Sequence, residues 1–209
     1  ASRDPATIEA FWKRHLDGFR LATPLPSALP PVAGATQSKS PMGSTQLDLS
    51  LDLTKELTAF AKNSSVTLSN VFQAAWAYIL HTYSTETDVV FGNTVAGRSA
   101  PVANLENVVG LLINTLPLRI FIERDMSIVD LLKAIQTQQL DMSQYEDTPL
   151  VEVQGWSEIE KGMPLFETLF VFENYPVAAS PMESLLIEDS DVQERTNFPL
   201  SVMVQNNDA

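Results

Sequence analysis

A wide apolar stripe between Thr67 and Ser84 is the feature that most constrains how this chain can fold. Apolar side chains recur there at the spacing of one helix face, namely Leu68, Val71, Phe72, Ala75, Trp76, Ile79, Leu80 and Tyr83. Exposing so wide a stripe to water costs free energy, so this helix must pack on a sheet or on another helix. The chain is therefore expected to build its core around it.

Further helices are predicted on both sides of this central one. Residues 5–18 begin with a proline suited to a first helical turn and stop at Gly18. Thr54 can cap a short helix through Lys62. Residues 127–145 carry a second long amphipathic pattern. Several helices are thus available to cover a sheet.

Strand patterns lie between the helices. Gln46 to Leu53 alternates leucines with polar residues, the period of a strand with one buried face. Further strands are expected over 88–95, 110–122, 165–172, 185–188 and 199–204. Because strands and helices alternate without an internal repeat, the sequence predicts an α+β fold with a mixed β-sheet layered with helices.

The stretch from Arg20 to Ser44 is rich in proline, alanine, serine and glycine and is nearly uncharged. This composition is typical of a surface connector. We therefore divide the chain into residues 1–44, a linker helix with a proline-rich connector, and residues 45–209, the main unit.

Composition narrows the possible partners. With 26 acidic and 13 basic residues, the net charge of −13 repels phosphate backbones and anionic membranes, so neither is expected as a partner. The sequence has no cysteine, no long apolar run and no signal-peptide pattern at its start, which suggests a soluble, cytoplasmic protein. Its two histidines, His15 and His81, lie far apart, so no metal site is expected.

The usual catalytic signatures are absent from the sequence. No serine sits in a Gly-x-Ser-x-Gly elbow, and neither histidine has an acidic partner nearby in the sequence that would mark it as a base. Glycines around Gly92-Asn93-Thr94 and Gly97-Arg98 allow backbone amides to approach a ligand, although glycine at a strand end more often forms a simple turn.

Two polar side chains, Asn114 and Thr115, interrupt an apolar strand pattern. A buried amide costs stability unless it is hydrogen-bonded, so these residues either pair structurally or line a channel. Arg119 likewise has a structural and a functional interpretation: it anchors a salt bridge, or it holds the substrate.

Several segments, in order, resemble the C-terminal part of the condensation domains of nonribosomal peptide synthetases. Phe11-Trp12 and Leu16-x-Gly18 are similar to the family's linker helix. Residues 109–119, Val-Gly-Leu-Leu-Ile-Asn-Thr-Leu-Pro-Leu-Arg, resemble its Gly-x-Phe-x-Asn-Thr-x-x-x-Arg signature, with Leu112 in place of the usual Phe. The remaining matches are Asp88 to Gly92 with Gly97-Arg98, Tyr145 to Leu150, in which Tyr145 replaces the usual His or Asn, and Phe172-Glu-Asn-Tyr-Pro176.

The resemblance implies a fold like chloramphenicol acetyltransferase, in which two halves meet at a tunnel and this chain is most of the second half, incomplete at its C-terminal end. It implies that Gly92, Asn93, Thr94, Asn114 and Thr115 line the substrate tunnel. Gly97, Arg98, Gly110 and Arg119 would be structural or belong to the floor loop.

The activity that the resemblance implies is peptide bond formation. Carrier proteins would deliver a donor thioester and an amine acceptor on phosphopantetheine arms, with no cofactor bound directly. The catalytic His-His-x-x-x-Asp-Gly motif belongs to the N-terminal half, which would be a partner, so this chain is expected to hold no catalytic residue and to be inactive alone. Two alternatives stay open: a noncatalytic module that docks carrier proteins, and an epimerisation or heterocyclisation relative.

Overall fold

A mixed four-stranded sheet forms the centre of the fold, with strand order β2-β1-β3-β4. The computed structural model describes residues 4–25, 43–97, 110–173 and 196–205. β1 pairs antiparallel with β2 and parallel with β3, and β3 pairs parallel with β4. The strands are β1 (Asp88–Val95), β2 (Asn114–Phe121), β3 (Thr168–Glu173) and β4 (Leu200–Gln205).

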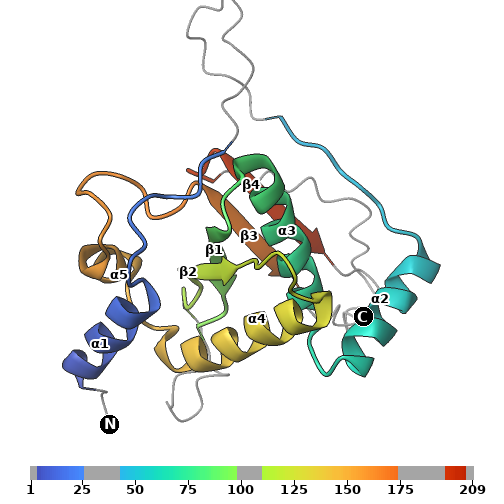
Figure 1. Ribbon diagram of the computed structural model, residues 1–209, viewed down its shortest axis with the longest axis horizontal. Helices are drawn as coiled ribbons and strands as arrows, with labels where there is room; N and C mark the ends of the chain where they lie inside the picture. The colour runs from blue at the N-terminus through green and yellow to red at the C-terminus, as the bar shows by residue number, and fades with distance from the viewer. Residues whose placement is uncertain (1–3, 26–42, 98–109, 174–195, 206–209) are drawn as a thin grey trace, which may run out of the picture.

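Helices surround this sheet (Figure 1). α3 packs on β1 and on α4, and α2 packs on α3 at the other side of the molecule from α1 and α5, which lie together. The helical elements are α1 (Pro5–His15), α2 (Leu51–Asn63), α3 (Leu68–Ser84), α4 (Ile128–Met142), the short 3₁₀ turn η2 (Ser143–Tyr145) and α5 (Leu150–Trp156). The predicted α+β class with a mixed sheet and covering helices is confirmed.

α1 belongs to the same hydrophobic core as the sheet. Trp12 is fully buried, and Phe11 and Leu16 are buried beside it in one cluster that includes Phe91 and Phe170 of the central strands. A helix that buries this much aromatic surface is held firmly, because each such side chain contributes about 1.5–3 kcal/mol on burial. The boundary at residue 44 remains a prediction.

The central helix is confirmed, but the face that it buries is only partly the predicted one, with Trp76 and Leu80 in common. Thr67 and Asn70 form a reciprocal capping box at its start. The buried residues are Asn70, Gln73, Ala74, Trp76, Ala77 and Leu80, whereas Ile79 and Tyr83 are 43% and 67% exposed. The helix is therefore rotated toward two polar residues, because both find hydrogen-bond partners inside the protein.

The strand predicted over residues 46–53 is wrong. Residues 43–50 have no regular structure, and α2 begins at Leu51 with Ser50 as its cap, the Ser50 hydroxyl accepting from the Leu53 amide at 3.3 Å. Leu47 and Leu53 are 84% and 41% exposed. Alternation stabilises a strand only when one face is buried, and here no described surface covers the leucines, so the helix cap prevails.

The other expected strands need smaller corrections. β2 begins at Asn114 rather than at residue 110, and the helix predicted over 127–145 ends at Met142 and continues as η2. The strand expected over 185–188 lies outside the described residues. Within the described residues, no helix is long and apolar enough to cross a membrane.

Gly92 gives a first test of this packing. A Cβ at residue 92 would lie 2.3 Å from Cε2 of Phe166, a buried ring that stacks on Phe198 at 5.3 Å. We expect Gly92→Ala to lower the free energy of unfolding by about 1–3 kcal/mol, because the ring must shift. Urea-induced unfolding measures the change.

Gly155→Ala is the matched control. Gly155 lies in α5 with open space around its Cα, so an added methyl meets nothing and improves helix propensity. We expect this variant to unfold at the same or higher urea concentration than the wild type. Equal destabilisation by both substitutions would show that the contact with Phe166 does not restrict residue 92.

Candidate functional site: a polar cavity at the end of β1

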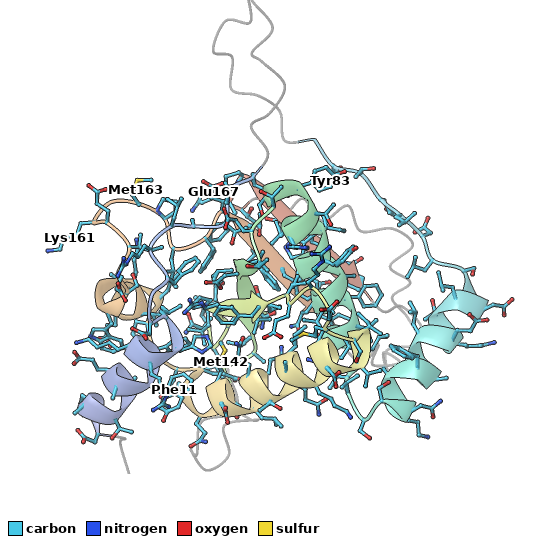
Figure 2. All side chains as sticks on the ribbon, viewed as in Figure 1. Phe11, Tyr83, Met142, Lys161, Met163 and Glu167 are labelled. Atoms are coloured by element: carbon cyan, nitrogen blue, oxygen red, sulfur yellow. The ribbon has the colours of Figure 1, made fainter. Side chains whose placement is uncertain are left out.

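A cavity of about 270 Å³ lies where the end of β1 meets the start of α3 and the end of α4. Six of the ten described residues that line it are polar, and the wall comes from α3, β1, α4, β3 and the segment between η2 and α5. The lining residues are Ser69, Gln73, Asn93, Thr94, Val95, Ala96, Gln139, Met142, Glu146 and Phe172. Met142, labelled in Figure 2, marks the end of α4 from which the chain continues to Glu146. Glu146 is the one ionisable residue among these described lining residues.

A network of side-chain amides forms the inner wall of the cavity. Asn70 Nδ2 donates to Gln73 Oε1 at 3.3 Å, and Gln73 Nε2 donates to Asn93 Oδ1 at 2.9 Å. Gln139 of α4 joins through a 3.0 Å bond from its Nε2 to Gln73 Oε1. Asn70, Gln73 and Asn93 are all buried. Because these amides satisfy one another away from water, they hold a fixed geometry between two helices and the sheet.

Asn114 positions the segment that carries Glu146. Its Nδ2 donates to the carbonyl oxygens of Glu146 at 2.9 Å and of Thr148 at 2.7 Å, and its Oδ1 accepts from the Thr115 amide. The Thr148 hydroxyl in turn accepts from Trp12 Nε1 at 3.1 Å in the buried interior. Asn114 therefore acts as a brace between β2 and the turn before α5 and does not line the cavity.

The predicted tunnel residues separate into two groups. Asn93 and Thr94 line the cavity, and the β1–β2 register places Thr115 opposite Thr94 and Asn114 opposite Val95. Gly92 does not line the cavity, since its missing side chain makes room for Phe166. The structure thus brings the polar ends of β1 and β2 together.

Of the residues predicted to belong to the floor loop or to be structural, Gly97 is packed against backbone and Gly110 is exposed. Gly97 has a φ of +63°, and a Cβ there would lie 1.9 Å from the carbonyl oxygen of Leu112, so only glycine fits. Gly110 is exposed with open space around it. Arg98 lies outside the described residues.

Arg119 is an anchor rather than a wall of the cavity. Its Nε and Nη2 donate to the two carboxylate oxygens of Asp88 at 2.9 and 2.8 Å, and its Nη1 donates to the carbonyl oxygens of His15 and Asp17. The guanidinium also lies 4.7 Å from the centre of the Phe121 ring. One buried cation thereby joins the end of α1 to β1 and β2.

His15 is held neutral beside this anchor. The pKa of His15 is lowered from 6.5 to about 4, mainly because burial disfavours the charged imidazolium. The charges of Arg119 and Arg14 add to this lowering, and a hydrogen bond to the Pro117 backbone opposes it. Its Nε2 is buried without a hydrogen-bond partner. The other histidine, His81, bonds the Glu86 carbonyl through Nδ1 at the far end of α3. Neither histidine lines the cavity.

A second cavity, of about 360 Å³, differs in character. It is lined by apolar side chains and prolines around the other end of α3, namely Pro24, Leu25, Trp76, Ile79, Leu80, Tyr83, Pro199 and Leu200. Figure 2 shows Tyr83 well away from Met142, which lines the polar cavity. Its wall offers little beyond apolar surface. Across the described ranges, histidine and acidic side chains do not gather in groups of three or more that could hold a metal ion.

Comparison with known proteins decides the family. The family model described as the condensation domain matches residues 1–209. This chain belongs to the condensation-domain family. One of the linear gramicidin synthase proteins of Brevibacillus parabrevis is 42% identical over 96% of this chain and 3% of its own length. Chondramide synthase cmdD of Chondromyces crocatus is 36% identical over 97% of this chain and 5% of its own length.

A solved structure extends the comparison to the fold. The starter condensation domain of rhizomide synthetase, bound to C8-CoA, matches with a TM-score of 0.61 and 22% identity, covering 80% of this chain and 36% of that one. The chain therefore spans about a third of a solved condensation domain and a small fraction of the curated synthetases. The chloramphenicol-acetyltransferase-like fold class and the suspected family are both confirmed.

Sequence reasoning missed the residues that complete the polar wall of this condensation-domain chain. Gln73, Gln139 and Glu146 were not singled out, although Gln73 shares helical spacing with Asn70, Ala77 and Leu80, all buried. Two amides on the buried face of an apolar helix are the signal that could have found the network. Glu146 had no such signal, because its place depends on Asn114, which lies 32 residues away in the sequence.

Asn114→Ala tests the brace. The substitution leaves the carbonyl oxygens of Glu146 and Thr148 without their donor, so we expect the free energy of unfolding to fall by about 1–3 kcal/mol. Hydrogen exchange should also rise locally at residues 146–148. As a control, Asn63→Ala at the exposed end of α2 should change stability by less than about 0.5 kcal/mol. Unchanged stability and exchange in Asn114→Ala would exclude the brace.

His15 should make the stability depend on pH. Above pH 6.5 the His15 imidazole is neutral in the folded and in the unfolded protein. Below pH 6.5 the unfolded chain binds a proton at His15, whereas the folded protein binds it only near pH 4. Stability should therefore fall, by at most about 3 kcal/mol, as the pH drops from 6.5 toward 4. His15→Asn keeps an amide donor for the Pro117 carbonyl. In this variant the free energy of unfolding, measured with urea, should change less between pH 6.5 and pH 5 than in the wild type. An unchanged slope in the variant would contradict this assignment.

Proposed function

We propose that this chain is the C-terminal part of a condensation domain in a nonribosomal peptide synthetase, where it helps to form a peptide bond between two carrier-bound substrates. The observation that supports this most strongly is the family match over the whole chain, together with a polar cavity built from that family's own signature segments. Asn93 and Thr94 follow the Asp-Val-Val-Phe-Gly segment, and Glu146 lies in the Tyr145 to Leu150 segment.

In the proposed reaction the acceptor amine attacks the carbonyl carbon of the donor thioester. A C–N bond forms, the C–S bond breaks, the amine loses a proton and the donor's phosphopantetheine arm leaves as a thiol. Holding both substrates in one channel replaces a slow encounter with an oriented reaction, an effect that can reach about 7–11 kcal/mol in favourable systems.

The residues of this chain would position the substrates and would not supply the base. His15 is enclosed beside Arg119, and His81 bonds a carbonyl at the far end of α3, so neither can reach the cavity as a base. The base would come from the His-His-x-x-x-Asp-Gly motif of the N-terminal half, which this sequence lacks. The chain alone would therefore be inactive, and the N-terminal half and carrier proteins would be its partners.

The test is single-turnover condensation followed by mass spectrometry, with donor- and acceptor-loaded carrier proteins. We expect no product from the 209-residue chain alone and product when the N-terminal half is present, either supplied separately or joined to this chain. Product from the chain alone would place the catalytic group here and contradict the assignment. Failure of the joined domain to form product, while its carriers stay loaded, would favour a noncatalytic docking module.

A further inference from the structure

Among the described residues that line the polar cavity, Glu146 is the one ionisable side chain. Within the described part of the chain, its carboxylate has no ion pair and no side-chain hydrogen bond. Its position is nevertheless fixed, since Asn114 holds its backbone carbonyl. A half-buried carboxylate is shielded from water on one side, so a cation brought by a ligand can pair with it at short range.

The amide network determines what Asn93 offers to the same cavity. Gln73 Oε1 accepts from Asn70 Nδ2, and Asn93 Oδ1 accepts from Gln73 Nε2. Asn93 Oδ1 is therefore occupied by Gln73 Nε2, and the group that remains is its NH2. Among the described residues, Asn93 Nδ2 has no acceptor of its own. The cavity thus presents a donor fixed by the network and, from a different element, a carboxylate.

This pair of groups matches one chemical class of ligand. A carboxylate binds an ammonium group, and a neutral N–H donor binds a carbonyl oxygen. An α-aminoacyl group has both an ammonium group and a carbonyl oxygen. Its nitrogen is on the α-carbon, which is bonded directly to the carbonyl carbon. The cavity of about 270 Å³ exceeds the roughly 150 Å³ that holds a benzene molecule, so an aminoacyl group fits.

We infer that this cavity binds the aminoacyl group of the acceptor substrate, with Glu146 holding its ammonium group and Asn93 its carbonyl oxygen. This inference rests on the proposed function and names the two residues that would bind the acceptor's aminoacyl group. A divalent metal is a poor alternative occupant, because a single carboxylate with amides and hydroxyls gives too few charged oxygen ligands.

Binding of a matched pair of small amides to the 209-residue chain tests the inference directly. N-(2-acetamidoethyl)alaninamide copies an alanyl group at the end of a phosphopantetheine arm, and N-(2-acetamidoethyl)propanamide is the same molecule without the amine. We expect the amine probe to bind at least about tenfold more tightly, equivalent to about 1.4 kcal/mol. NMR titration should place its shifts at Asn93, Thr94 and Glu146. Equal binding of the two probes, or binding of neither, would overturn the inference.

Variants separate the two contacts. Glu146→Gln keeps the size of the side chain but removes the charge, so the preference for the amine probe should disappear. Asn93→Asp keeps the acceptor for Gln73 but loses the NH2 that would hold the carbonyl oxygen, so the neutral propanamide probe should bind more weakly. Glu160→Gln, an exposed position away from the cavity, should leave both affinities unchanged. Urea unfolding of each variant shows whether it is folded; a folded Glu146→Gln variant that still prefers the amine probe would overturn the assignment of Glu146.

Condensation in the joined domain distinguishes this inference from the proposed function. With the wild type active, Glu146→Gln should raise the concentration of acceptor-loaded carrier needed for half-maximal rate by about tenfold and leave the saturated rate within twofold. Glu160→Gln should match the wild type in both quantities. If the wild-type domain makes product and Glu146→Gln behaves identically, the acceptor site is elsewhere although the function holds. If the wild type makes no product, the proposed function fails, while the probe titration still decides which ligand the cavity prefers.

Discussion

The paired hydrogen bonds between Arg119 and Asp88 are the interaction on which the rest of the structure depends. The same guanidinium holds the last carbonyl of α1, at His15, and the next turn at Asp17. A buried cation lowers stability unless its N–H groups have hydrogen-bond partners. Here the Asp88 carboxylate accepts from Nε and Nη2 of Arg119, and two backbone carbonyls accept from Nη1. Helix α1 is thus fixed to the antiparallel pair of strands β1 and β2.

Two further hydrogen bonds connect α1 to the segment that carries the cavity's acidic residue. α1 carries Trp12, whose indole nitrogen bonds Thr148, and the Thr148 carbonyl is held by Asn114 at the start of β2. The segment between these bonds includes Glu146. The acidic side chain of the cavity is therefore positioned from α1 and β2 at once, while its amide wall is positioned by α3 and α4. Four elements that are distant in sequence set one small site.

The sequence predicted the sheet, the central helix and the family because these depend on local patterns and on ordered motifs. It failed where long-range partners decide the outcome. The leucines of residues 46–53 alternate like a strand, yet no described surface covers them and the Ser50 cap starts a helix instead. α3 turns Asn70 and Gln73 inward because Gln139 and Asn93 meet them, and no pattern within α3 reveals those partners. Asn93 was found from its motif, but Glu146 was not.

The central claim is that this condensation-domain chain supplies a binding site for the acceptor's aminoacyl group. A crystal structure of the joined domain with N-(2-acetamidoethyl)alaninamide bound tests it most directly. We expect the ligand nitrogen at about 2.8 Å from a Glu146 carboxylate oxygen and the ligand carbonyl oxygen at about 3.0 Å from Asn93 Nδ2. An alaninamide bound elsewhere in the domain, with the cavity between α3, α4 and β1 holding only water, would contradict it.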